Sequence, residues 1–559
     1  MRNFINISIL FLCILISPIQ IYSEVLSKEI PDKIPGNIYF YAGIKDFEKH
    51  YNNLQKTKFW LNFSKSDIKK DMHNSRKGLR FEQELKKYEN ILGFKIIEKN
   101  FRNLLSEEVA VALYEFKDLH SIYIVKVDKE KKVKKFLKKN KNKLKPRKYL
   151  DVEYYGYNEN DPDNTFAILF DKKNIFISNQ IDLILKIIDI KKGRKDIKKL
   201  SENREFMGVN DILNKNYNAF AYFDLDRCAE NSYFQRYWYP QDNHEFNSIN
   251  SEFIIYEFKK KYIIEDKYFN IKDNSESISI NTINNKIFHY IPRSCLLFIA
   301  KVEEEFNSFF KKYITEESEI SKNRVNSFGH GSIPWIWKET IKNKNDYNLK
   351  LNDLNEIFGN SYAKVNIFTN EKNSTEYLSV FIVERKKNPE IFKALRQILE
   401  DYFNNSFHLS TEKLIKLNVR KKGQFKIFYP NLPNYPPDLI PAFAVTSDFF
   451  FFPSNLNAAE LFIAQLKRGT FKRILNEKIL ESKNLKLVYR INFNVNRDHI
   501  DSFIKQGLNA YWLTYSEQSI LRRDMLEMHS FVEKIQVIEG VRVKVTSHSE
   551  KEKTKYYFK

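Results

Sequence analysis

Two acidic residues offer the simplest chemistry in this sequence. Asp224 and Asp226 lie two residues apart in a segment with strand-like alternation, Phe223-Asp224-Leu225-Asp226-Arg227. Side chains two residues apart in a strand project from the same face, so this pair could bind a cation or act as an acid and a base. A corresponding later segment has Asn494 and Asn496 instead. Because asparagine can cap a turn but cannot act as a general base, we expect capping and not catalysis here.

Other residue types that support catalysis form no recognisable motif. The ten histidines are scattered, without HExxH, an i,i+4 pair or an accompanying CxxC, so we expect no zinc site. The 14 glycines include neither a P-loop nor a G-x-G-x-x-G fingerprint, which disfavours nucleotide enzymes. We therefore expect no cofactor, no metal and no catalytic residues.

A strongly basic segment runs from residue 129 to residue 148 and contains twelve Lys and Arg residues. Apolar residues interrupt it at helical spacing, which predicts an amphipathic helix. Such a helix could lie on an anionic surface. The corresponding helix after Pro389 is far less basic, so we favour an ordinary solvated lysine face. The candidate contact residues are Lys131, Lys134, Lys135 and Lys138.

An aromatic cluster follows Asp226-Arg227, and a smaller one occupies a comparable place near residue 511. Aromatic rings in a polar loop can form a platform for a sugar or a lipid. They can equally close over the core of a folded unit, which is the interpretation that we favour. The residues concerned are Tyr233, Phe234, Tyr237, Trp238, Tyr239, Tyr511 and Trp512.

The first residues have the layout of a secretory signal. One basic residue, Arg2, precedes an apolar run from Phe4 to Ile16 that is too short to span a bilayer comfortably, and Ser23 offers a small residue for cleavage. We expect residues 1–23 to be a signal peptide and the protein to be exported to the periplasm or cell envelope. An uncleaved anchor is the alternative.

Charge and cysteine content bear on partners and on the compartment. With 93 Lys and Arg against 71 Asp and Glu, the net charge is +22. For an exported protein the polyanions at hand are an anionic membrane surface and envelope polysaccharide, and we expect no nucleic acid partner; lysine-rich solvated faces are the simpler account. Cys228 and Cys295 are too few for a disulfide framework, and we expect two buried thiols over one bridge.

Two halves of the chain share an ordered series of landmarks. Ile34-Pro35-Gly36 opens one apolar strand, and Ile291-Pro292-Arg293 opens another. Phe176-Ile177-Ser178-Asn179 and Phe452-Pro453-Ser454-Asn455 each precede a helix, with Ser or Asn as the expected cap and a glycine after the last turn. Later in each half, Phe223 corresponds to Phe493.

These elements predict an α+β fold with a tandem duplicated module, in which each copy is a mainly antiparallel sheet with helices packed on one side. We expect the first α+β module over residues 24–285 and the second, with longer loops, over residues 286–559. Strands are expected from Glu252 to Phe258 and from Tyr262 to Ile271, and two further strands around a turn at Glu539-Gly540.

On these landmarks the chain resembles a bacterial family of exported proteins, domain of unknown function 3352, apparently in two copies. That family assigns no catalytic residues, so the resemblance implies a fold and export and leaves the function open. The residues that carry it are the Ile34-Pro35 strand, Leu92-Gly93, Leu105-Ser106-Glu107-Glu108-Val109-Ala110, the stretch from Ile175 to Gly193, Phe206 and Tyr222-Phe223-Asp224.

The sequence therefore favours an exported envelope or periplasmic protein that is not an enzyme and that acts in binding, scaffolding or surface contact. One alternative is a lipid or glycan carrier with an aromatic-lined cleft. Another is an envelope hydrolase, which would need convergent polar groups with shifted pKa values in one cleft.

Overall fold

The chain divides into two compact units in the computed structural model. Unit 1 comprises Met1–Glu276 and His548–Lys559, and unit 2 comprises Ser277–Ser547. The described residues are 30–45, 53, 55–65, 76–95, 108–127, 130–139, 143–158, 165–194, 196–207, 218–232, 234, 249–272, 282–302, 333, 336–337, 340–341, 349–350, 353–368, 377–386, 388–406, 415–432, 434–471, 484–492, 535–546 and 549–558.

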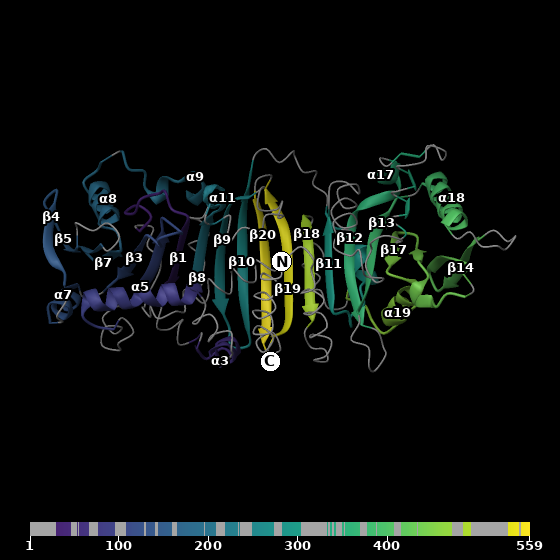
Figure 1. Ribbon diagram of the computed structural model, residues 1–559, viewed down its shortest axis with the longest axis horizontal. Helices are drawn as coiled ribbons and strands as arrows, with labels where there is room; N and C mark the ends of the chain where they lie inside the picture. The colour runs from purple at the N-terminus through teal and green to yellow at the C-terminus, as the bar shows by residue number, and fades with distance from the viewer. Residues whose placement is uncertain are drawn as a thin grey trace. The chain divides into compact units, whose positions relative to one another are not determined.

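Unit 1 is built on an antiparallel sheet with the strand order β4-β5-β6-β7-β3-β2-β1-β8-β9-β10-β20 (Figure 1). Its outer strand β4 is short and polar, whereas the central strands are almost continuously apolar because both of their faces are covered. The strands are β1 (Phe40–Lys45), β2 (Glu108–Leu113), β3 (Ser121–Lys126), β4 (Lys145–Tyr149), β5 (Val152–Tyr157), β6 (Phe166–Asp171), β7 (Asn174–Ser178), β8 (Ala219–Asp224), β9 (Ile249–Phe258), β10 (Tyr262–Ile271) and β20 (Ser549–Phe558).

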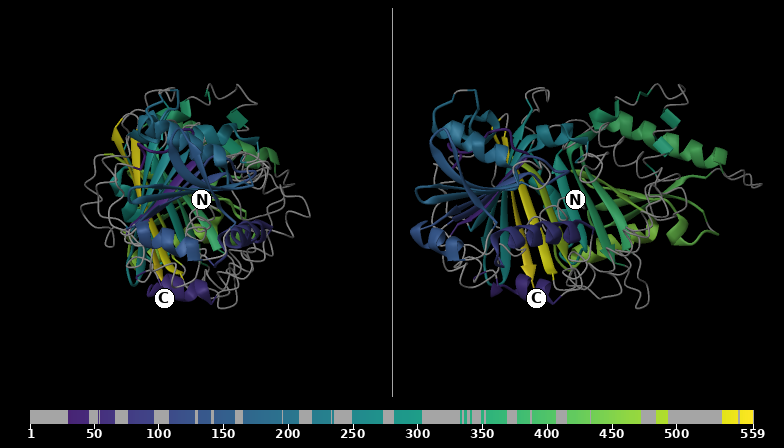
Figure 2. Two further views of the ribbon diagram at one scale, coloured as in Figure 1. Left: turned by 90° about the vertical axis from the view of Figure 1, so that its left-hand side faces the viewer. Right: turned by 60° about the vertical axis from the view of Figure 1, so that its left-hand side comes forward.

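Helices cover both faces of this sheet (Figure 2). Ile124, Leu169 and Phe176 share one core with α8, whereas their strand neighbours pack in a second core with α5 and α7. Neighbouring residues of a strand point to opposite faces, so the two cores lie on opposite sides of the sheet. The helices are α3 (Lys58–Ser64), α5 (Arg76–Leu92), α7 (Glu130–Lys139), α8 (Ile181–Lys191), η2 (Leu200–Glu202), α9 (Arg204–Met207) and α11 (Leu225–Glu230).

Unit 2 has an antiparallel sheet with the order β14-β15-β16-β17-β13-β12-β11-β18-β19. The strands are β11 (Leu297–Val302), β12 (Phe358–Phe368), β13 (Tyr377–Arg385), β14 (Leu417–Lys422), β15 (Phe425–Pro430), β16 (Phe443–Val445), β17 (Phe449–Pro453), β18 (Leu485–Asn492) and β19 (Ile535–Thr546). The helices are η3 (Asn285–Tyr290), α17 (Leu354–Ile357), α18 (Pro389–Ser406), η7 (Pro437–Leu439) and α19 (Leu456–Lys467).

Helices also cover both faces of the unit 2 sheet. Phe451 packs with α19 in one core, and its strand neighbours Phe450 and Phe452 pack with α18 in the other. The mixed α+β class and the antiparallel pairing are therefore as expected, but the expectation of helices on one side is wrong. Each sheet is apolar on both faces, and a two-layer arrangement would leave one of those faces exposed to water.

Local signals place the helix ends and the first strands. Asn455 caps α19 by accepting a hydrogen bond from the Ala458 N–H at 2.8 Å, and Gly193 and Gly469 follow α8 and α19 with positive φ. Pro35 bridges Lys199 and Pro292 bridges Thr470, each in an isolated pairing shortly before β1 or β11 begins.

The expected cap of α8 is wrong. Gln180 occupies that position without a side-chain cap bond, and Asn179 instead accepts from the Ser121 N–H at 2.9 Å. The sequence comparison matched Phe176 with Phe452. In the structure Phe176 packs with α8, but the residue that packs with α19 is Phe451, so this pair of landmarks differs from the expected one by one residue. Phe493 lies outside the described residues.

Two further expectations about the chain's last strands differ from the structure. No turn interrupts residues 535–546, which form the single strand β19, with Gly540 lying under the ring of Tyr489. The last ten-residue strand, β20, pairs with β10 and so belongs to unit 1, whereas the expected second module ran to residue 559.

Candidate functional site

The exposed lysines of α7 form a strongly charged helix face in unit 1. Lys131, Lys132, Lys135, Lys138 and Lys139 are exposed within one arc of the helix, which we call the lysine face, and Val133 on the opposite side is buried in the core. Lys134 differs from them, because its Nζ lies 2.6 Å from Glu130 Oε1 and 4.8 Å from the centre of the Phe170 ring. The lysine face therefore contains three of the four lysines expected as contact residues.

Strand β4, the next element in the chain after this helix, carries further basic residues. Lys145, Arg147 and Lys148 are exposed, and β4 pairs with β5 as the first strand in the sheet order. Lysine and proline on an outer strand discourage pairing with other chains, so the charge of β4 has a purely structural explanation as well. In unit 2 the outer strand β14 likewise exposes Arg420 and Lys421.

The expected aromatic platform is represented by one described residue. Phe234 is 5% exposed, its ring centre lies 5.0 Å from that of Phe116, and its N–H donates to Asn231 Oδ1 at 2.9 Å. This ring therefore closes over the core, as favoured from the sequence. Tyr233, Tyr237, Trp238, Tyr239, Tyr511 and Trp512 lie outside the described residues.

Asp224 is a helix cap, in agreement with the sequence-based interpretation. It ends β8 and accepts a hydrogen bond from the Arg227 N–H at 3.0 Å, which begins α11. Asp226 lies inside α11 and forms an ion pair with Lys272. The two carboxylates therefore do not share a strand face, because the strand ends between them. Asn494 and Asn496 lie outside the described residues.

Sequence reasoning missed a second acid near Asp224. Burial raises the pKa of Glu205 in α9, and the neighbouring charge of Asp224 raises it further. Burial also raises the pKa of Asp224, against the opposing effect of its bond and charge contact with Arg227. Asn270 links this corner to β9 by donating to Glu205 O at 3.1 Å and to Ser251 Oγ at 2.8 Å. Only the folded chain brings these residues together.

Titratable groups with shifted pKa values often mark functional sites, but ion networks also shift them. Here the two acids have structural roles, since Asp224 caps α11 and the α9 backbone is tied to β10. Among the described residues no group of three or more His, Cys, Asp or Glu side chains is arranged to hold a metal ion.

A buried lysine lies among glutamates on β9, β10 and β20. Lys267 Nζ is 2.7 Å from Glu265 Oε1 and 4.0 Å from Glu252 Oε1, and Glu552 faces Lys267 across the strand pair. Burial lowers the pKa of Lys267, but the three glutamates raise it overall above its ordinary value. The ammonium therefore stays charged inside the sheet. Alternating charges in a strand are typical of a solvated surface, so this cluster could not be predicted from the sequence.

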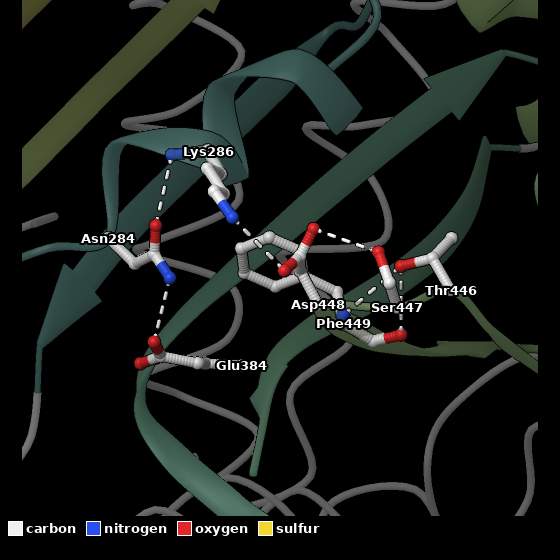
Figure 3. A network of polar contacts seen from close by, with 7 residues as sticks. All are labelled: Asn284, Lys286, Glu384, Thr446, Ser447, Asp448 and Phe449. Atoms are coloured by element: carbon white, nitrogen blue, oxygen red, sulfur yellow. Dashed lines mark hydrogen bonds and ion pairs between the residues drawn. The ribbon is translucent and has the colours of Figure 1, made fainter. Parts of the chain in front are cut away.

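A polar network ties the start of unit 2 to the rest of that unit (Figure 3). Asn284 Oδ1 accepts from the Lys286 N–H at 3.1 Å, and its Nδ2 donates to Glu384 Oε1 at 2.7 Å. Lys286 Nζ pairs with Asp448 Oδ1 at 3.2 Å. The network caps η3 and fixes the turn before β17, so it explains local structure and not chemistry.

A hollow in unit 2 lies at the C-terminal end of α18. It has a volume of about 460 Å³ and is lined mainly by polar side chains, including Gln397, Glu400, Asp401 and Asn404. Asn404 is occupied in holding the neighbouring chain, since it accepts from the Ile415 N–H at 2.6 Å. This hollow does not have the aromatic lining expected of a lipid or glycan cleft.

Comparisons with known proteins leave the assignment open. No protein-family model matches the chain, and no curated protein matches it significantly. A solved structure titled "Structure of crystal form IV of TP0453" matches at 6% identity and a TM-score of 0.25, over 43% of this chain and 79% of that one. No helix in the described part of this chain is both long and apolar enough to cross a membrane.

Proposed function

We propose that this chain is an exported protein of the periplasm or cell envelope that acts by binding or surface contact and not by catalysis. The observation that carries this proposal is the lysine face of α7, Lys131, Lys132, Lys135, Lys138 and Lys139, with the exposed basic residues of β4 close to it in the sequence. Each lysine near an anionic membrane surface contributes about 1 kcal/mol of attraction at ordinary salt concentrations.

The contact would be electrostatic and would not insert into a bilayer. Val133 points into the core beneath α7, so this side of the helix already has a partner within unit 1. A helix that inserts needs its apolar face free. Binding through the lysine face alone weakens as salt screens the charges.

We also propose that the two units are copies of one module, which includes the resemblance to domain of unknown function 3352. The supporting observations are the shared strand order, the bridges made by Pro35 and Pro292, and the glycines that follow α8 and α19. The lysine face belongs to one copy, because α18, which follows β13 as α7 follows β3, has no comparable lysine stripe.

Vesicle binding by the full mature chain tests the proposed contact. A variant with Lys131→Gln, Lys135→Gln and Lys138→Gln should bind anionic phospholipid vesicles at least tenfold more weakly than the wild type in low salt. A matched control carries Lys393→Gln, Lys421→Gln and Lys426→Gln, which removes the same charge from exposed positions of unit 2 and should bind like the wild type. An equal loss in both variants would attribute binding to net charge and contradict a specific surface.

A parallel titration with an acidic polysaccharide separates the two polyanions available in an envelope. Binding to vesicles but not to the polysaccharide would assign the face to membranes, and the reverse would assign it to glycans. Binding of neither by the wild type would exclude the lysine face as a contact surface and favour its reading as a solvated helix face.

A further inference from the structure

The last strand of the chain is held in unit 1 although the residues just before it belong to unit 2. Strand β20 pairs with β10 from Tyr262 opposite Tyr557 to Asn270 opposite Ser549. The two apolar cores of unit 2 are formed by residues between 283 and 488, with Val541 and Val543 packed against one of them. Those cores are therefore built without any contribution from β20.

On one face of the sheet, β10 holds β20 by a charge clamp. Asp266 Oδ2 lies 3.6 Å from Lys551 Nζ, and its Oδ1 lies 3.7 Å from Lys553 Nζ. Lys551 Nζ also lies 5.0 Å from the centre of the Tyr268 ring. A single acid of β10 is thus flanked by two lysines of β20, each two residues from the other.

On the other face, a second set of contacts fixes the same register. Glu552 is 5% exposed and faces Lys267, and the hydroxyl of Tyr556 donates to Glu265 Oε2 at 3.4 Å. A shift by one residue would move Glu552 to the face of Asp266 and the two lysines to the face of Lys267. Glu552 would then face Asp266, and the two lysines would face Lys267. Because like charges repel in a buried site, β10 accepts a strand only in the observed register and with matching charges.

We propose that β10 is a strand-acceptor site that also takes β20 from a second copy of this chain, so that two chains exchange their C-terminal strands. The incoming strand would make the same ladder and the same ion pairs as the strand it replaces. Exchange of a terminal element between identical chains is a low-cost route to a dimer, because no new contact has to be created. Within one chain β20 is held near its own β10 at a high effective concentration, so the monomer is favoured at low protein concentration and the dimer at high protein concentration.

Charge reversal on the full chain tests this proposal. The first variant carries Asp266→Lys, and the second carries Lys551→Asp with Lys553→Asp. In each variant alone, like charges oppose β20 at its own β10, so residues 549–558 should lose protection from hydrogen exchange. In an equimolar mixture each β10 meets a β20 of opposite charge from the other chain. A one-to-one dimer should then form, measured by light scattering and native mass spectrometry.

The matched control combines all three substitutions in one chain. Its clamp is complementary again, so it should be a monomer at the same concentration and should protect residues 549–558. A mixture that remains monomeric while this control regains protection would overturn the proposal, because the clamp would then act only within a chain. Unchanged protection in both single-sided variants would overturn it as well, since charge would not select the strand.

A second experiment keeps the native charges and does not depend on the stability of those variants. One chain carries Tyr262→Cys and another carries Tyr557→Cys, at positions that face each other across β10 and β20. After joint incubation at high concentration and mild oxidation, exchange predicts a covalent dimer containing one chain of each kind. Absence of that dimer, or equal amounts from either variant alone, would contradict strand exchange.

Discussion

At the scale of single residues, two partly buried acids lie where β8, α9 and α11 meet. Asp224 ends a strand and begins a helix, and Glu205 lies against it from α9. Burial raises the pKa of both carboxyls. A raised pKa in the folded state means that the fold binds the proton more tightly than the unfolded chain does, so stability falls as pH rises through that pKa.

The direction of this pKa shift predicts how Asp224→Asn changes the stability of unit 1. Asparagine keeps the oxygen that accepts from the Arg227 N–H, and it removes a charge that burial disfavours. We expect the unfolding free energy of unit 1 at pH 8 to equal or exceed that of the wild type, with a smaller decrease as the pH rises to 8 from about 4, near the ordinary pKa of an aspartate. Urea denaturation followed by hydrogen exchange of residues 219–230 measures both.

Asp224→Ala is the matched control for the cap. It should lower the unfolding free energy by about 1 kcal/mol at both pH values, because the first turn of α11 loses its acceptor. If the asparagine variant were as unstable as the alanine variant, the carboxylate charge itself would be needed, and the capping interpretation would be wrong.

Single-residue roles were predictable from sequence where a local rule decides them. The cap at Asp224 and the buried thiols Cys228 and Cys295 are confirmed for this reason. Glu205 and Lys267 could not be found, since their partners come from strands and helices distant in sequence. A local sequence pattern would predict both charges to be exposed, whereas the folded chain buries Lys267 and partly buries Glu205.

At the scale of elements, α8 and α19 occupy comparable places but begin differently. Asn455 caps α19 through the Ala458 N–H, whereas Gln180 before α8 makes no side-chain cap. We expect Asn455→Ala to lower the unfolding free energy of unit 2 by about 1 kcal/mol more than Gln180→Ala lowers that of unit 1, because only the first substitution removes a cap bond. Chemical denaturation of the two variants checks this pair. Equal losses would show that the cap bond does not stabilise α19.

Strands whose apolar residues recur at regular spacing were predictable from the sequence. Strands that depend on their pairing partners were not. The strands expected at 252–258 and 262–271 form β9 and β10. The turn expected at Glu539-Gly540 fails because Gly540 accommodates the Tyr489 ring instead of bending the chain. Strand β20 has three lysines and two glutamates in ten residues, and its pairing with the matching charges of β10 could not be found from a local pattern.

At the scale of the whole molecule, the predicted signal peptide makes export directly testable. Cleavage after Ser23 should give a mature chain that begins near Glu24 and is recovered from the periplasm or the exterior. Intact mass measurement of the fractionated protein checks this expectation. A cytoplasmic product that retains residues 1–23 would contradict export and the envelope role proposed above.

The two buried cysteines allow the opening of each unit to be measured separately. Cys228 belongs to unit 1 and Cys295 to unit 2. Burial raises the pKa of both thiols, that of Cys295 to about 12, so neither forms the reactive thiolate in the folded chain at neutral pH. A thiol reagent can therefore modify each one only while its unit is open. Labelling times at these two positions measure how often each unit opens, in the native chain and without an added probe.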